Sequence, residues 1–161
     1  MSTNRGKDFE NVIKSTLIEC ADLSLDRFYD PTAGYAGVQN ICDFVAYKFP
    51  FEYYFECKSI LGNTLNFKAD ITAGQWNGLT EKSKIRGVYA GIIVWFIAHD
   101  TTAFVPISEL NRLAVAGVKS LNIKDIRDDF VKHVIVPGIK KRVFFKYDGT
   151  KFIENLQKLE T

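Results

Sequence analysis

The chain has 161 residues, 47% of them hydrophobic, and this length and composition predict a single domain over residues 1–161 with its own core. Its 21 basic and 19 acidic residues leave a net charge of +2, so an anionic partner must be bound by a local basic patch. The polar first ten residues and the short apolar runs argue against a signal peptide or membrane span, and we expect a cytoplasmic protein, in the host cytosol if a phage encodes it.

Hydrophobic periodicity and turn residues predict alternating helices and strands. The expected elements, in chain order, are a helix over residues 5–22 capped by Asn4 or Asp8, a strand over 26–30, a turn over 31–37, hairpin strands over 41–47 and 52–59, a loop over 61–68, a helix from Asp70 or Thr72 to about Lys84, strands over 88–98 and 103–107, a helix capped by Ser108 and ending near Gly117, a helix over 122–130, a strand over 142–147 and a helix over 151–159.

This order of elements predicts a mixed β-sheet flanked by helices, α/β or α+β in class. The core of the domain is expected within about residues 5–107, with peripheral elements over 108–161.

The predicted hairpin brings two acidic residues together. If its turn is centred between Phe49 and Pro50, residues equally far from that point face each other, and Asp43 lies opposite Glu56. Alternate strand residues share a face, so Lys58 points the same way as Glu56. Facing Cβ atoms on antiparallel strands are about 5 Å apart. Two carboxylates there repel, so that one pKa rises or a cation lies between them, and an all-oxygen site suits Mg²⁺ or Mn²⁺.

An acid pair beside a lysine is also compatible with an ordinary solvated surface of ion pairs. The other face of the second hairpin strand, with Tyr53, Phe55 and Cys57, is apolar, which indicates a sheet strand with a buried back. The three cysteines, Cys20, Cys42 and Cys57, lack metal-ligand spacing and are expected to be reduced core thiols, with Cys42 opposite Cys57.

Several motifs follow one another along roughly the first 95 residues. They are Asn4-Arg5-Gly6-Lys7 with Phe9-Glu10, Cys42-Asp43-Phe44, Phe55-Glu56-Cys57-Lys58-Ser59, Asn66-Phe67, and Gln75 ahead of Gly78-Leu79. Together they resemble the PD-(D/E)XK nuclease superfamily and, within it, RecU-type Holliday junction resolvases. The resemblance implies a restriction-endonuclease-like core. It departs over residues 24–40, which replace a long basic projection of RecU-type proteins, and it does not extend past about Lys119.

The resemblance implies a Mg²⁺-dependent endonuclease in which Mn²⁺ can substitute. A phosphodiester repels hydroxide, so its hydrolysis needs charge neutralisation and an activated water. Asp43, Glu56 and the backbone carbonyl of Cys57 would ligate the metal ion, and Lys58 would orient or deprotonate the attacking water.

Two further polar residues have alternative roles. Glu10, on the first helix, is either a ligand, directly or through water, or an exposed helical acid. Gln75, on the second helix, either steadies the lysine or the scissile phosphate or is an ordinary polar residue. The implied catalytic set is Asp43, Glu56, Lys58, Gln75 and Glu10.

DNA is the implied partner, in particular four-way junctions in recombination, repair or phage DNA processing. The candidate phosphate contacts, each otherwise a solvated charge, are Arg5 and Lys7 in a flexible amino-terminal arm and Lys82, Lys84 and Arg86 at the end of the second helix. The cluster Lys140-Lys141-Arg142 either contacts DNA or keeps a surface soluble. Cutting two opposed strands of a junction requires two active sites, which implies a homodimer.

Two other functions remain open: a nuclease of the same fold that acts on ordinary duplex or mismatched DNA, and a catalytically silent DNA-binding module. The complete set of acids, lysine and glutamine argues against the silent module. His99 and His133 are isolated and no phosphate-cradling glycine loop occurs, so zinc and nucleotide sites are not predicted.

Overall fold

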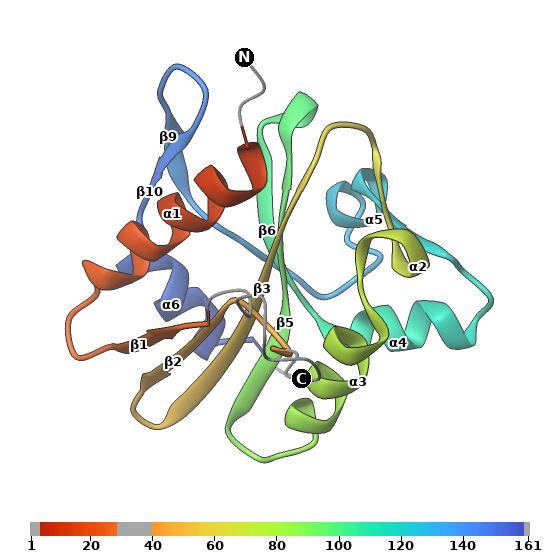
Figure 1. Ribbon diagram of the computed structural model, residues 1–161, viewed down its shortest axis with the longest axis horizontal. Helices are drawn as coiled ribbons and strands as arrows, with labels where there is room; N and C mark the ends of the chain where they lie inside the picture. Colours follow the sequence, from red (N-terminus) through yellow and green to blue (C-terminus); the bar gives the residue numbers. More distant parts are fainter. Residues whose placement is uncertain (1–3, 29–39, 160–161) are drawn as a thin grey trace, which may run out of the picture.

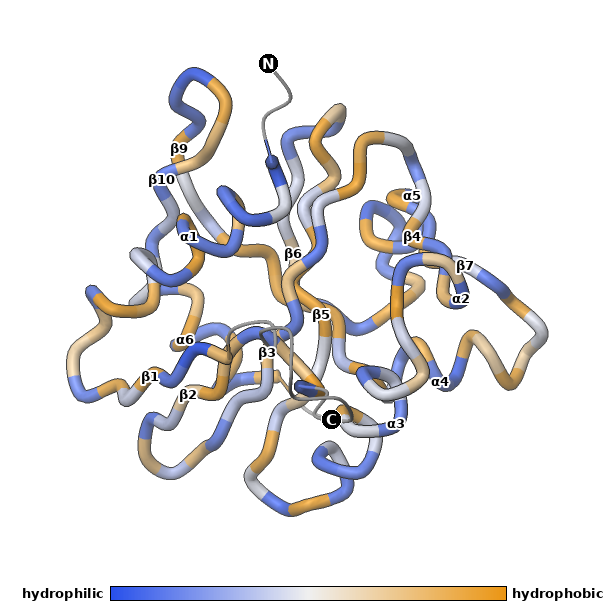
Figure 2. The backbone as a smooth tube through the Cα atoms, in the orientation of Figure 1, coloured by the Kyte–Doolittle hydropathy of each residue, from blue (hydrophilic) through white to orange (hydrophobic). Residues whose placement is uncertain are grey.

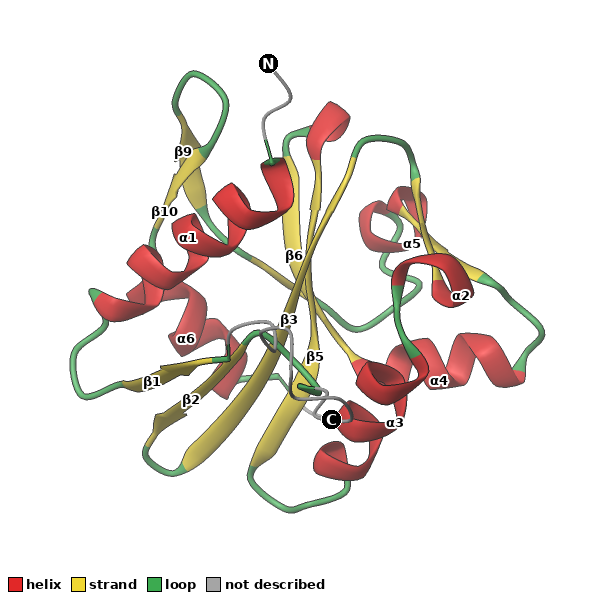
Figure 3. Ribbon diagram, viewed as in Figure 1, coloured by secondary structure: helices red, strands yellow, loops and turns green. Residues whose placement is uncertain are grey.

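The computed structural model of the protein describes residues 4–28 and 40–159. Its centre is a mixed six-stranded sheet with the strand order β1-β2-β3-β5-β6-β8, flanked by helices on both faces (Figures 1 and 3). The predicted fold class is therefore confirmed. No helix within these residues is both long enough and apolar enough to cross a membrane.

The helices are α1 (Arg5–Ile18), α2 (Phe67–Asp70), α3 (Ala73–Ser83), α4 (Ile107–Val115), α5 (Ile123–Arg127) and α6 (Gly149–Gln157), with a 3-10 turn, η1 (Ile97–His99). The strands are β1 (Ser24–Arg27), β2 (Phe44–Lys48), β3 (Phe51–Ile60), β4 (Thr64–Asn66), β5 (Val88–Phe96), β6 (Thr101–Pro106), β7 (Ser120–Asn122), β8 (Val134–Ile135), β9 (Gly138–Lys140) and β10 (Phe145–Tyr147).

Strand β3 lies inside the sheet, between β2 and β5. It pairs antiparallel with β2 on one side and parallel with β5 on the other. A parallel pair needs a long crossover connection, and here it contains β4, α2 and α3. The crossover places α3 beside β3 and β5, where its residues can reach the polar face of β3.

Two hydrophobic cores fill the space between the sheet and its helices. One packs α1 and α6 against the sheet and contains Phe9, Phe55, Trp95 and Phe152. The other packs α3, α4 and α5 against the opposite face and is formed around residues such as Leu79. Figure 2 shows the strand β5 at the centre as a largely hydrophobic stretch, as expected for a strand covered on both faces.

The carboxyl-terminal segment is part of this core. Strand β8 joins the edge of the central sheet at β6. Phe152, Ile153 and Leu156 of α6 are buried in the same cluster as Phe9. The residues after Ile107, which we expected to be peripheral, therefore contribute to both cores: α6 packs beside α1 on one face of the sheet, and α4 and α5 belong to the opposite layer.

Several predicted elements differ in their ends or in type. The first helix ends at Ile18 and not at residue 22, and the strand expected over 26–30 is β1, Ser24–Arg27. The prediction of a loop over 61–68 was wrong, because Thr64–Asn66 forms strand β4, which pairs with β7. The prediction that Ser108 caps a helix was also wrong, because α4 begins at Ile107, directly after β6.

Other helix starts follow the capping residues of the sequence. Asn4 caps α1 and Thr72 caps α3, as predicted. Asn122 caps α5, which ends at Arg127, and Asp148 starts α6 two residues earlier than expected. The strand expected over 142–147 is confined to β10, and the predicted turn over residues 31–37 lies outside the described residues.

Candidate active site

The β2–β3 hairpin has the predicted register, with Phe44 opposite Phe55. Asp43 lies one position before β2, but its backbone N–H still donates to the carbonyl of Phe55 at 3.0 Å. Its Oδ2 atom accepts a hydrogen bond of 2.8 Å from the backbone N–H of Cys57. The Asp43 carboxylate is thereby fastened to β3 next to Glu56.

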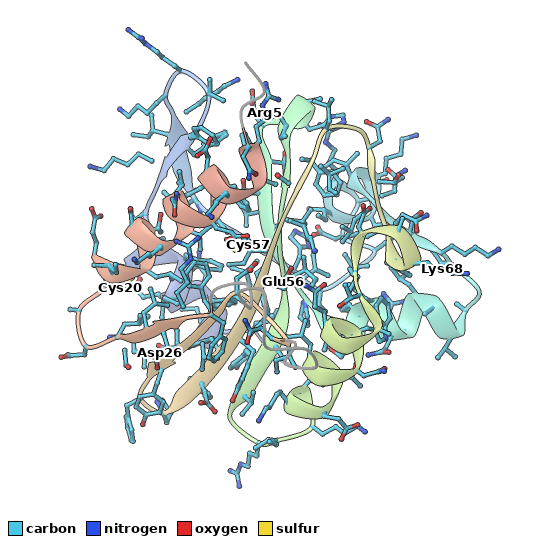
Figure 4. The ribbon with its side chains drawn as sticks, viewed as in Figure 1. Arg5, Cys20, Asp26, Glu56, Cys57 and Lys68 are labelled. Atoms are coloured by element: carbon cyan, nitrogen blue, oxygen red, sulfur yellow. The ribbon has the colours of Figure 1, made fainter. Side chains whose placement is uncertain are left out.

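Glu56 is the centre of a polar cluster on β3. Its side chain is buried, with the residue only 4% exposed. The Oε2 atom lies 3.0 Å from Nζ of Lys58, on the same face of the strand, and accepts a hydrogen bond of 3.0 Å from Nε2 of Gln75. The Asp43 carboxyl lies within hydrogen-bonding reach of it. The structure therefore brings four of the five predicted catalytic residues together around Glu56, which is labelled in Figure 4.

The start of α3 fixes the orientation of Gln75. Thr72 and Gln75 form a capping box, in which the Thr72 hydroxyl accepts from the Gln75 N–H at 3.1 Å and Gln75 Oε1 accepts from the Thr72 N–H at 3.1 Å. Because its oxygen is used by the helix cap, the amide presents its NH₂ group to Glu56. The cap thus decides which end of the amide reaches the site.

A close contact between α3 and the segment before Asp43 holds the two parts of the site together. A Cβ atom built on Gly78 would lie 2.3 Å from Cγ2 of Ile41. Only glycine leaves room for this approach. Gly78 and Gln75 are three residues apart on the same helix, so one packing contact sets the positions of both.

The two neighbouring acids perturb each other. Burial and then the charge of Asp43 raise the pKa of Glu56 from 4.5 to about 8, although Lys58 acts in the opposite direction. Near neutral pH, Glu56 therefore keeps a proton as long as no cation compensates the paired carboxylates. Burial also raises the pKa of the Cys57 thiol, and Asp43 and Glu56 add to this effect.

The donor set fits a hard divalent cation. The carboxyl groups of Asp43, directly before β2, and Glu56, on β3, lie side by side and repel when both are ionised, which is the arrangement that a cation stabilises. Among the residues that the structure describes, no group of three or more His, Cys, Asp or Glu side chains could hold a metal ion. Water and phosphate oxygens would have to complete the coordination, as is usual for Mg²⁺. The role of the Cys57 carbonyl stays a prediction.

Glu10 does not join the Glu56 cluster directly. Its Oε2 atom lies 3.0 Å from NH2 of Arg27 on β1, and NH1 of Arg27 donates to Oδ1 of Asn11 at 2.7 Å. Glu10, Arg27 and Asp43 nevertheless line one hollow of about 350 Å³, together with Asn4, Gly6, Lys7 and Phe28. The open space beside Asp43 is therefore bounded by both acidic and basic groups.

Arg27 was not predicted as a site residue. Its side chain is 9% exposed and its guanidinium lies 5.7 Å from the ring centre of Phe44. No motif of the sequence marks Arg27, because its partner Glu10 belongs to a different element and the contact exists only in the folded chain. The only local signal is strand alternation, which places Leu25 and Arg27 on the same face of β1 but does not identify Glu10 as the partner of Arg27.

The candidate DNA-binding residues fall into separate groups. Arg5 and Lys7 were expected in a flexible arm, but they form the first turn of α1, where Oδ1 of Asn4 accepts from the Lys7 N–H; Arg5 is labelled in Figure 4. Lys82 lies in the last turn of α3, with Nζ 5.3 Å from the ring centre of Tyr54. Lys84 pairs with Glu81 at 2.8 Å, and Arg86 follows the helix. Of these residues, only Lys7 lines the hollow beside Asp43.

The thiols agree with the predicted reduced core. Cys20, Cys42 and Cys57 are all buried and form no disulfide.

Comparisons with known protein families and with curated proteins found no match. Among solved structures, the chain is similar to Hjc, a Holliday junction resolvase from the archaeal hyperthermophile Archaeoglobus fulgidus. The sequence identity is 21%, the similarity covers 65% of this chain and 78% of that chain, and the TM-score is 0.48. A similarity of this size assigns neither a family nor an activity to the chain, so the function has to be inferred from the site.

Proposed function

We propose that the protein is a metal-dependent DNA endonuclease that hydrolyses phosphodiester bonds. The observation that carries the proposal is the buried Glu56 carboxyl, which is held between Asp43, Lys58 and Gln75 at the middle of the central sheet. A purely structural ion pair does not need a second acid beside it. The cluster combines oxygen ligands for a cation with an ammonium group that can meet an anion.

Each residue of the cluster has a distinct task in the proposed reaction. Mg²⁺ held by Asp43 and Glu56, or Mn²⁺ in its place, would supply charge neutralisation and a water of lowered pKa. The Lys58 side chain is 22% exposed, so its ammonium can contact a phosphate oxygen and orient the attacking water. Gln75 keeps the Glu56 carboxylate in one orientation. Glu10 and Arg27 bound the open side and can position the DNA backbone.

We further propose that the preferred substrate is branched DNA, most specifically a four-way junction, and that two copies of the chain act together as a homodimer. The motif order along the first half of the chain supports this choice of substrate. The alternatives are a nuclease that cuts ordinary duplex or mismatched DNA and a DNA-binding module without activity. The first alternative would cut a different DNA structure and the second would cut none, so one cleavage assay separates both from the junction proposal.

The test incubates the protein with end-labelled four-way junctions, linear duplexes and single strands, with and without Mg²⁺. We expect Mg²⁺-dependent cleavage of the junction and loss of cleavage in Asp43→Asn. The matched control is Glu52→Gln, which removes an acid from the same strand outside the cluster. Equal cutting of linear duplex would remove the junction preference. Junction binding without any cleavage would leave only the binding module.

A further inference from the structure

The β9–β10 hairpin stands outside the central sheet. Its strands are hydrogen-bonded to each other in a separate two-stranded sheet, with Phe145 opposite Lys140 and Lys146 opposite Ile139. Figure 1 shows it as a projection beside α1 that rises past the amino-terminal end of this helix. An isolated two-stranded hairpin is marginally stable in water, so it has to be held by the rest of the protein.

One face of the hairpin is anchored to the body. The Tyr147 hydroxyl shares a buried hydrogen bond of 2.6 Å with the hydroxyl of Thr102 on β6. The ring centres of Phe144 and Trp95 are 5.4 Å apart. Nζ of Lys140 lies 2.8 Å from Oδ1 of Asp100. These contacts hold the hairpin in one position relative to the sheet.

The remaining charge of the hairpin is positive and faces solvent. Residues 138–147 contain the basic residues Lys140, Lys141, Arg142 and Lys146 and no acid. Lys141 and Arg142 at the turn and Lys146 on the outer face are exposed, and none of them forms an ion pair with a residue that the structure describes. Figure 2 shows a hydrophilic stretch at the apex next to a hydrophobic one. Clustered like charges repel unless an anion meets them, so this surface is suited to contact a polyanion.

The position of the hairpin continues a line of positive charge from the site. Arg5 and Lys7 lie in the first turn of α1, and Lys7 lines the hollow that also contains Glu10 and Asp43. The hairpin rises beside this end of α1 (Figure 1). A polyanion that enters the hollow past Lys7 would therefore continue toward the tip of the hairpin.

We propose that the β9–β10 hairpin is a second DNA-binding element, which holds the phosphate backbone of a duplex arm outside the cleavage site. The inference rests on the proposed function, because it takes DNA as the substrate of the Glu56 cluster. A two-stranded ribbon fits a duplex groove in size. Lysine and arginine at its tip would contact phosphates, which fixes the position of the DNA without selecting a base sequence.

The experiment measures binding and cleavage separately. A charge reversal at the tip, Lys141→Glu with Arg142→Glu, is compared with Lys68→Glu plus Lys119→Glu, which changes the net charge equally. Lys68 lies on the opposite side of the protein (Figure 4), and Lys119 is near it, because its carbonyl accepts from the Phe67 N–H. Dissociation constants are measured with fluorescent four-way junctions that have long or short arms, without a divalent ion, over a range of salt concentrations. Thermal unfolding verifies that all variants are folded.

We expect the tip variant to bind the long-armed junction about tenfold more weakly, with a log–log salt slope lower by about two, since each phosphate contact contributes about 0.9. Binding of the short-armed junction should change little, and the control should resemble the wild type. Wild-type binding by the tip variant, or an equal loss in the control, would overturn the inference. The nuclease proposal and the hairpin proposal can fail separately. If the protein binds DNA through the hairpin tip but never cuts it, the hairpin proposal stands and the nuclease proposal fails.

Discussion

Two buried glutamates, one on β3 and one on α4, have opposite electrostatics. Glu56 on β3 is 4% exposed and Glu109 on α4 is 8% exposed, and each has a basic partner within 3.0 Å. The pKa of Glu56 is raised to about 8. Burial also raises the pKa of Glu109, but hydrogen bonds from the Arg112 side chain and the Lys132 backbone N–H outweigh it, and the net pKa is lowered.

The difference lies in the neighbours and not in the burial. The Glu109 carboxylate is surrounded by donors, one of which joins the loop before β8 to α4, and it has the character of a structural clamp. Glu56 has donors too, but it shares its environment with Asp43. Placing a buried acid beside another acid does not stabilise the fold, and a strongly perturbed pKa of this kind is typical of functional sites.

The largest expected effect tests the acid pair directly. Under the proposed function, Asp43→Asn should lower Mg²⁺-dependent cleavage by about 10³-fold or more, because the proposed cation would lose one of its two protein carboxylates. At pH 9, where Glu56 is ionised, the free energy of unfolding should stay equal or increase, since the substitution relieves the repulsion between the two carboxylates. Single-turnover cleavage and denaturant unfolding measure the two quantities. Normal cleavage by Asp43→Asn would disprove the site.

The second effect follows from the raised pKa of Glu56. The folded state binds the proton more tightly than the unfolded chain, so this contribution to stability is present below pH 4.5 and is lost as pH rises to about 8. Glu56→Gln should therefore be more stable than the wild type at pH 9, on the order of 2 kcal/mol, with little difference near pH 4. Urea unfolding across this range measures it.

Mg²⁺ should counteract the loss at high pH. Ligands that bind only the folded state raise its stability, so Mg²⁺ should stabilise the wild type more at pH 9 than at pH 6 and should have little effect on Glu56→Gln. A stabilisation by Mg²⁺ that is independent of pH and of Glu56 would contradict the proposed binding site.

A third effect tests the packing that holds the pair in place. Gly78→Ala introduces a methyl group against Ile41 and should lower the free energy of unfolding by about 1–3 kcal/mol, the range of overpacked cores. It should also reduce cleavage, because Ile41 is two residues before Asp43. Gly62→Ala is the matched control, since nothing lies within 4 Å of its added methyl group. Equal effects of the two substitutions would show that α3 does not position Asp43.

The smallest effect concerns the other glutamate. Glu109→Gln weakens hydrogen bonds to Arg112 and the Lys132 amide and should cost about 1 kcal/mol of unfolding free energy at pH 7, without changing cleavage. Because the pKa of Glu109 is lowered on folding, this stabilisation is lost as pH falls below its ordinary value of 4.5. Chemical unfolding at pH 7 and pH 3 measures this: the stability difference between the wild type and Glu109→Gln should shrink at the lower pH, whereas the difference for Glu56→Gln grows as the pH rises. A loss of cleavage in a stably folded Glu109→Gln would contradict the clamp.

The sequence predicted those parts of the site that depend on local periodicity. Strand alternation and a two-residue turn determine which side chains of a hairpin meet, so Asp43, Glu56 and Lys58 were placed correctly relative to one another. Gln75 followed from the motif order, and Thr72 from helix capping.

The rest of the molecule depends on contacts between distant elements. The pairing of β4 with β7 joins segments more than fifty residues apart, and no local pattern of Thr64–Asn66 distinguishes it from a loop. The same applies to Arg27, whose partner Glu10 is on another element, and to α6, which completes a core begun by α1.

The capping box of α3 has a consequence for the amino acid allowed at position 75. As a helix cap, glutamate would serve as well as glutamine, since either side chain can accept from the Thr72 N–H. Next to Glu56, glutamate would lose the donated N–H and add a third negative charge. A natural homologue with glutamate at this position would thus keep the helix cap but lose the hydrogen bond to Glu56, so under the proposed function the residue at position 75 should distinguish active homologues from inactive ones.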